Sequence, residues 1–119
     1  MESHIPPNKY QLAGVDDLDR GFNRQAEIRW IEGQCHAIFQ YEKFFLESPP
    51  QTSEQEALTM LIAQLHERGY TQLRTRLQFR GEEYLGNQEI WEEHRDPQAG
   101  NVLLRLFGYI RQFWQNART

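Results

Sequence analysis

The sequence predicts an α+β fold, in which an antiparallel four-stranded sheet carries two helices on one face. Two stretches, residues 25–46 and 73–93, alternate apolar and polar side chains with the period of a strand, and each is followed by a helical pattern. The predicted order is therefore ββαββα. Tight turns join the strands of each pair, which favours antiparallel over parallel pairing. The second face of such a sheet would remain open to water or to a partner.

An irregular N-terminal arm, residues 1–24, is expected to precede a single α+β domain that spans residues 25–119. Pro6 and Pro7 exclude a helix and remove backbone donors that a strand would use. Turn-forming Gly, Asp and Asn residues then surround isolated apolar side chains, through which we expect the arm to dock partly onto the domain. These apolar residues are Leu12, Val15, Leu18 and Phe22.

Residues 25–46 predict a β-hairpin. Ala26, Ile28 and Trp30 alternate with charged residues, and Glu32–Gly33 has the composition of a tight turn. The return strand places Cys35 on its apolar face, and neighbouring strand residues point to opposite faces. We therefore interpret Cys35 as a core residue rather than as a nucleophile activated by the next histidine.

The first helix is expected over residues 54–68. Ser53 and Glu56 form a capping box at its start, and Gly69 is typical of the position just after a helix. Its apolar stripe has the spacing i, i+3, i+4, i+7 of a core-facing helix. The stripe consists of Leu58, Leu61, Ile62 and Leu65, and its expected partners are Phe39, Leu77, Phe79, Leu103, Phe107 and Ile110.

The second unit begins with a strand from Leu73 that has one apolar face and one basic face. The return strand should run from Tyr84 to about Glu93, with a bulge or second turn at Gly86–Asn87. Asp96–Pro97 is the expected opening of the second helix, because proline is favoured at the first helical position.

Composition limits the classes of function. The chain has 119 residues, a net charge of −4 and one cysteine. It has no apolar run long enough for a membrane span and no secretory signal at its start, so we expect a cytoplasmic protein that does not associate with membranes. The acidic balance makes nucleic acid an unlikely partner by charge alone.

No catalytic motif stands out. The four histidines lack the spacing of a metal site, and there is no phosphate-binding glycine loop, serine elbow or HExxH sequence. We therefore predict no catalytic residues, no metal and no cofactor. A non-catalytic protein is favoured over an enzyme.

The basic face of the second unit is the candidate partner-binding site. Arg74 and Arg76 lie two residues apart and so point the same way, Arg80 lies two steps further on, and Trp91 is expected beside them on the return strand. Such a row would suit carboxylates on an extended peptide. The alternative is that the arginines pair with the five glutamates of residues 82–93 and only hold the hairpin together.

Three functions follow from these patterns. The first is a non-catalytic protein-binding or assembly-accessory protein, similar to a chaperone in its role, which would bind its partner through the basic face. The second is a small enzyme or small-molecule binder with a pocket between sheet and helices, lined by Tyr41, His36, Glu42 or His94. The third is an RNA-binding sheet that uses aromatic stacking. The open sheet face and 15 aromatic side chains also predict a homodimer. The sequence identifies neither the partner nor a substrate.

Overall fold

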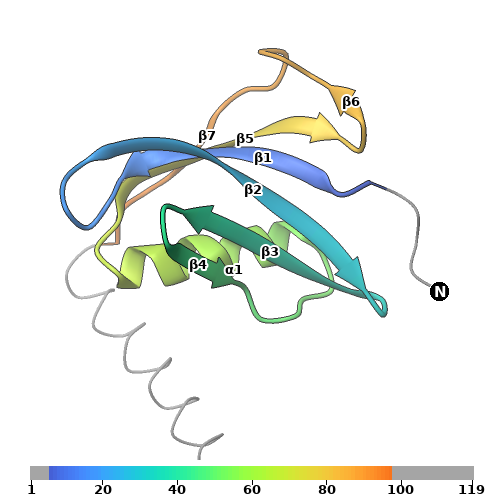
Figure 1. Cartoon of the computed structure of the whole chain (residues 1–119), viewed down its shortest axis with the longest axis horizontal. Coiled ribbons are helices and arrows are strands. Elements are labelled where there is room, and N and C mark those ends of the chain that lie inside the picture. The colour runs from blue at the N-terminus through green and yellow to red at the C-terminus, as the bar shows by residue number, and fades with distance from the viewer. Residues whose placement is uncertain (1–5, 98–119) are drawn as a thin grey trace, which may run out of the picture.

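The computed structural model describes residues 6–97, which form one helix and one antiparallel sheet of seven strands. The strand order is β4-β3-β2-β1-β5-β6, and β7 also pairs with β5 (Figure 1). The elements are β1 (Asn8–Val15), β2 (Gly21–Ile31), β3 (Gln34–Tyr41), β4 (Phe44–Glu47), α1 (Glu54–Glu67), β5 (Thr71–Arg80), β6 (Glu83–Tyr84) and β7 (Glu92–His94).

The prediction of a four-stranded sheet with two helices on one face is wrong. The sheet is larger, and α1 is the helix that the described residues contain. The second predicted helix, with its stripe Leu103, Phe107 and Ile110, lies outside the described residues. What holds is the antiparallel pairing, since every strand pair in the sheet is antiparallel.

The irregular N-terminal arm is also wrong, because β1 is a central strand. It pairs with β2 on one side and with β5 on the other. Leu12 is fully buried in the core, and Ala13 is almost fully buried. The Pro6–Pro7 pair ends just before the first strand residue, so it removes no donor from the ladder. Asp16, Asp17 and Asp19 make the β1–β2 connection instead.

Gly14 allows β1 to approach β5 closely. A Cβ atom at Gly14 would lie 2.8 Å from Leu73 Cδ2 and 2.9 Å from the carbonyl oxygen of Thr71. The pairing of the two strands is irregular here, with a register shift between Ala13 and Val15, and Gln72 has a positive φ of 54°. Glycine is therefore required by space, not by its own backbone conformation.

The predicted hairpin of residues 25–46 is confirmed as β2 and β3, but the return strand expected to continue to Leu46 ends at Tyr41, where a second turn at residues 42–43 leads into β4. Glu32 and Gly33 both have positive φ, 53° and 78°, as the two central residues of a type I′ turn require. Cys35 is fully buried in the core, which confirms its interpretation. Burial raises the pKa of its thiol to about 11, so the reactive thiolate is disfavoured.

The first helix is confirmed as α1. The Ser53 hydroxyl accepts a hydrogen bond from the Glu56 N–H at 3.2 Å, and Gly69 follows the helix with a φ of 91°. The helix carries the chain from β4, at one edge of the sheet, to β5, on the other side of β1. α1 packs against one face of the sheet, mainly on β3 (Figure 1).

The core lies between α1 and the sheet face that it covers. All four stripe residues are buried, as is Phe39, which confirms this part of the predicted core. Leu77 and Phe79 are only partly buried. The remaining buried side chains come mainly from the first half of the chain and include Leu12, Phe22, Ala26, Ile28, Ala37 and Tyr41.

The return strand expected over residues 84–93 is broken into β6 and β7, which share the outer edge of β5. β6 pairs with Phe79 and Arg80, and β7 pairs with Leu73–Thr75. Gly86 lies between them with a φ of 58°.

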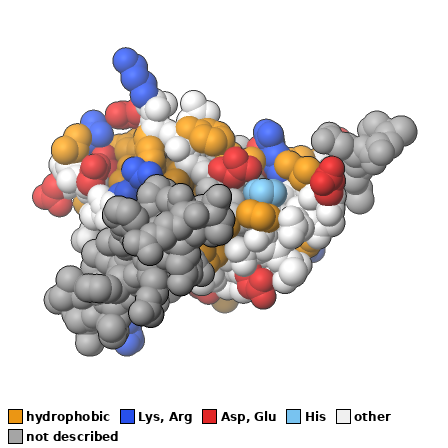
Figure 2. Space-filling view, turned by 90° about the horizontal axis from the view of Figure 1, so that it is seen from below, with side chains coloured by type: hydrophobic (Ala, Val, Ile, Leu, Met, Phe, Trp, Pro, Cys, Tyr) orange, Lys and Arg blue, Asp and Glu red, His pale blue; other side chains and the backbone are white. Residues whose placement is uncertain are grey.

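Within residues 6–97, no helix is long and apolar enough to cross a membrane. Figure 2 shows one side of the molecule, on which apolar, acidic and basic side chains are interspersed.

Candidate functional site

Arg74 and Arg76 lie on the face of β5 that α1 does not cover. Side chains alternate along a strand, and the neighbours Leu73 and Thr75 are buried against the core. Trp91 comes from the loop just before β7, which pairs with the same part of β5. The structure thus brings three of the four predicted site residues together.

Both guanidinium groups stack on the indole ring. The Cζ atom of Arg76 lies 4.3 Å and that of Arg74 lies 5.0 Å from the ring centroid of Trp91. Such contacts contribute about 0.5–1 kcal/mol each at exposed sites. Arg76 also donates from Nε to Gln11 Oε1 at 2.9 Å, which ties it to β1. We call these three residues, Arg74, Arg76 and Trp91, the Arg–Trp surface.

Arg80 is not part of the Arg–Trp surface. The β1–β5 register shifts by one residue after Leu77, so that Phe79 pairs with Lys9. The Lys9 ammonium lies 5.6 Å from the centroid of the Phe79 ring, on the uncovered face. Phe79 therefore takes the orientation that unbroken alternation would give to Arg80. Arg80 forms an exposed ion pair of 3.8 Å with Glu89.

Trp91 is positioned by the attachment of β7 to β5. Thr75 Oγ1 lies 2.7 Å from His94 Nε2, and the Asp96 carboxylate accepts a hydrogen bond of 2.9 Å from the Gln72 N–H. Burial lowers the pKa of His94 below its ordinary value, against the opposing effect of the Glu92 carboxylate. The neutral imidazole is therefore the form that β7 is built around.

Acid is expected to loosen β7 through His94. Its folded-state pKa is lowered, so the stabilisation is present above the unfolded pKa of about 6.5 and is lost as the pH falls through the folded pKa. Urea unfolding at about pH 7.5 and about pH 5.5 should show a smaller loss of stability in His94→Gln than in the unmodified chain. Equal losses in the two proteins would contradict this role.

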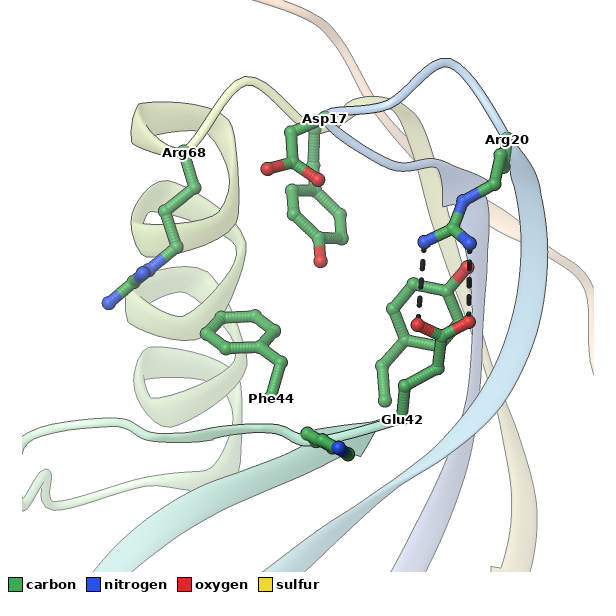
Figure 3. Close-up of a pocket in the computed structure, with 8 residues that line it drawn as sticks. Asp17, Arg20, Glu42, Phe44 and Arg68 are labelled. Carbon is green, nitrogen blue, oxygen red and sulfur yellow. Dashed lines mark hydrogen bonds and ion pairs between the residues drawn. The ribbon is translucent and has the colours of Figure 1, made fainter.

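A pocket of about 400 Å³ lies elsewhere in the fold, where the β1–β2 turn, the β3–β4 turn and the end of α1 meet (Figure 3). Its apolar lining consists of the rings of Tyr41, Phe44 and Tyr70. Its polar lining consists of Asp17, Arg20, Glu42, Lys43 and Arg68. Tyr41 and Glu42 were among the residues expected around a pocket, whereas His36 and His94 are not part of its lining.

Asp16 organises this end of the molecule. Its buried carboxylate accepts hydrogen bonds from the backbone N–H groups of Leu18 and Arg20, from the Tyr41 hydroxyl at 2.8 Å and from Arg20 Nε at 3.0 Å. Burial acts to raise the pKa of Asp16, but these donors together outweigh it and lower the pKa. The ionised carboxylate thus fixes the turn and the Arg20 side chain.

Sequence reasoning missed this pocket because it assigned the Asp-rich segment to an arm. The signal that could have indicated this turn is the group of Asp16, Asp17 and Asp19 between Val15 and Phe22, because closely spaced aspartates are typical of a turn between strands. The pocket also needs Lys43 and Arg68, which belong to distant turns.

Comparisons of the chain with family models, with curated proteins and with solved structures find no match.

Proposed function

We propose that this protein is a non-catalytic binding protein that uses the Arg–Trp surface to bind an acidic, extended segment of a partner protein. The observation that carries the proposal is the stacking of both guanidinium groups on Trp91 at 4.3 and 5.0 Å. Among the ion pairs of the described residues, none involves Arg74 or Arg76. Their positive charge is therefore available to a partner.

Stacking leaves the chemistry of the guanidinium group intact. A guanidinium over a ring keeps its N–H donors, and two of them can bind a carboxylate with parallel hydrogen bonds. Arg74 forms none of the side-chain hydrogen bonds of the described residues, whereas Nε and one terminal nitrogen of Arg76 donate to Gln11, which leaves the outer edge of Arg76 for a ligand. Arg74 and Arg76 are about 6.5–7 Å apart along the strand, the same repeat that separates alternate side chains of an extended peptide. The exposed part of the indole supplies an aromatic anchor of the kind that dominates interfaces.

The alternative hairpin-scaffold role explains Arg80 better than it explains the Arg–Trp surface. Arg80 pairs with Glu89, as a scaffold requires. Arg74 lies directly opposite Glu93 across β5 and β7, yet it contacts the ring of Trp91 rather than that carboxylate. Nucleic acid draws most of its affinity from many phosphate contacts, and a chain of net charge −4 with two arginines at the site offers few of them, which favours a peptide over RNA as the ligand.

Charge reversal at Arg74 is expected to weaken binding of an acidic peptide about tenfold or more. The probe is a fluorescein-labelled ten-residue peptide of alternating Glu and Thr, which presents carboxylates at the repeat of Arg74 and Arg76, and the measurement is fluorescence anisotropy. Arg74→Glu should lower the free energy of unfolding by about 0.5–1.5 kcal/mol, because it removes the contact with Trp91 and places a second carboxylate opposite Glu93. The double variant Arg74→Glu, Arg76→Glu should abolish binding.

Arg29→Glu is the matched control. Arg29 is also exposed on the uncovered face, on β2, where it pairs with Glu27. The Arg29→Glu variant should bind the peptide nearly as tightly as the unmodified chain does. Equal losses in Arg29→Glu and Arg74→Glu would show a non-specific charge effect and refute the proposal. A marked loss of stability in Arg74→Glu would support the scaffold role, and tighter binding of a ten-residue uridine oligonucleotide than of the peptide would support the RNA-binding alternative.

A homodimer stays part of the proposal. Several large apolar side chains are at least two-fifths exposed in the single chain, among them Ile31 and Phe45 on the uncovered side of β2 and β4. Sedimentation equilibrium of the same samples measures the molecular mass. A single species of 14.2 kDa at high micromolar concentration would remove the dimer from the proposal.

A further inference from the structure

The pocket formed by the β1–β2 turn, the β3–β4 turn and the end of α1 points to a second binding site. We propose that it binds a small organic anion with an aromatic ring, in which the ring lies on the pocket's aromatic side chains and a carboxylate or similar group meets the arginines at its rim. Its volume of about 400 Å³ is within the range of small-molecule sites. The site shares no residue with the Arg–Trp surface.

The aromatic side of the pocket is held rigidly. The ring centroids of Phe44 and Tyr70 are 6.0 Å apart, and those of Tyr70 and Phe22 are 5.6 Å apart. Phe22 in turn contacts Tyr41 at 5.2 Å. Tyr41 and Tyr70 are buried to more than nine-tenths, so the rings that line the pocket are part of one packed cluster. Phe44 is the least buried of the three lining rings, so a flat ligand ring would contact Phe44 above all, against a floor formed by the two buried tyrosines.

Arg68 is the candidate partner for an anionic group at the outer rim of the pocket. Its guanidinium lies 4.8 Å from the centroid of the Phe44 ring, and Figure 3 shows it on the outer side of that ring, turned away from the space between Asp17 and Glu42. It forms none of the ion pairs of the described residues, and its in-plane donors remain available. Phe44 thus positions Arg68 much as Trp91 positions Arg74.

Arg20 provides a second, preorganised donor. Asp16 holds its Nε atom, while its two terminal nitrogens face the Glu42 carboxylate at 3.4 and 3.5 Å. Those two contacts are long and exposed, so a ligand carboxylate can compete with Glu42 for the same donors. Lys43 adds a third cation to the lining.

Tyr70 contributes a polar group inside the pocket. Its hydroxyl forms none of the hydrogen bonds found among residues 6–97. Burial, followed by the nearby Asp17 carboxylate, raises the pKa of Tyr70, so the hydroxyl is protonated at neutral pH and can donate. It completes a site that offers ring faces, an O–H donor and cations.

The charge at the rim favours an anion over a cation. The lining has three basic side chains against the two carboxylates of Asp17 and Glu42, and Glu42 is already paired with Arg20. The end of α1 carries a partial negative charge, but two of its last carbonyls, those of Leu65 and His66, accept hydrogen bonds from the N–H groups of Arg68, Gly69 and Tyr70. The Asp17 carboxylate, which points toward the open space in Figure 3, limits the ligand to one that keeps its anionic group away from the β1–β2 turn.

Three probes that share one ring system test the proposal by titration calorimetry with the full chain: 2-naphthylacetate, its neutral amide and 2-naphthylethylamine. The acetate should bind about tenfold more tightly than the amide, and the amine should bind most weakly. Arg68→Gln should reduce the affinity for the acetate about tenfold while leaving that for the amide nearly unchanged. The matched control Arg29→Gln, far from the pocket on β2, should bind all three probes as the unmodified chain does.

Several results would overturn the proposal. These are the absence of acetate binding below about 1 mM, equal affinity for acetate and amide, preference for the amine, or an Arg68→Gln variant that binds the acetate normally. Arg74→Glu serves as a cross-check, because it should abolish peptide binding at the Arg–Trp surface and leave naphthylacetate binding intact. Failure of one site is thereby separated from failure of the other.

Discussion

Leu61→Ala is expected to lower the free energy of unfolding by about 2–5 kcal/mol. Leu61 is fully buried on the face of α1 that packs against the sheet. Truncation removes apolar surface and leaves a cavity that neighbours held in the sheet can only partly fill. Unfolding in urea, followed by circular dichroism, measures the change.

Gln55→Ala provides the control for helix propensity. Gln55 is exposed in the first turn of α1, so its replacement removes no core contact. Its effect should remain within about 0.5 kcal/mol. A loss below about 1 kcal/mol for Leu61→Ala would mean that α1 does not cover the core as described.

Gly14→Ala is expected to destabilise the protein by about 1–3 kcal/mol, although it adds a single methyl group. The new Cβ atom would lie within 3 Å of both a side-chain carbon of Leu73 and the carbonyl oxygen of Thr71. The oxygen belongs to the backbone of β5, so relief requires the two central strands to move apart. Denaturant unfolding, or the shift in midpoint temperature, measures the cost.

Gly21→Ala is a closely matched comparison. Gly21 lies at the other end of the same β1–β2 connection and pairs with Val15, but the nearest atom to its added methyl group would be 4.0 Å away. Its φ is not positive, so alanine fits, and the smaller entropy of the unfolded chain should make the change neutral or slightly stabilising. Similar losses in both variants would show that the close approach at Gly14 is not the cause.

Local patterns predicted the elements whose signals lie within short stretches of sequence. The capping residues of α1, its apolar stripe and the Glu32–Gly33 turn act over a few residues, and the structure confirms each of them. The strand β1 was missed because its apolar face contains only Tyr10, Leu12 and Gly14, and because one of its two partners, β5, follows much later in the chain. No pattern within residues 1–24 identifies that pairing.

The candidate sites differ in the same way. The period of two along β5 was enough to place Arg74 and Arg76 side by side, and Trp91 follows because β7 returns to the same strand. Arg80 was grouped with them because a one-residue bulge between Leu77 and Phe79 leaves no mark in the alternation. The pocket could not be predicted, since its lining comes from three turns whose meeting depends on the complete sheet.

The central position of β1 has a consequence for the time course of folding. β2, β3 and β4 form consecutive hairpins and can pair as soon as they leave the ribosome, whereas β1 can complete its second ladder only after β5 has been made. Bringing such distant segments together costs loop-closure entropy before any contact compensates it. The docking of β5 beside β1, together with α1, should therefore be the slow step, and until it occurs β1 forms an exposed edge that can pair with a neighbouring chain.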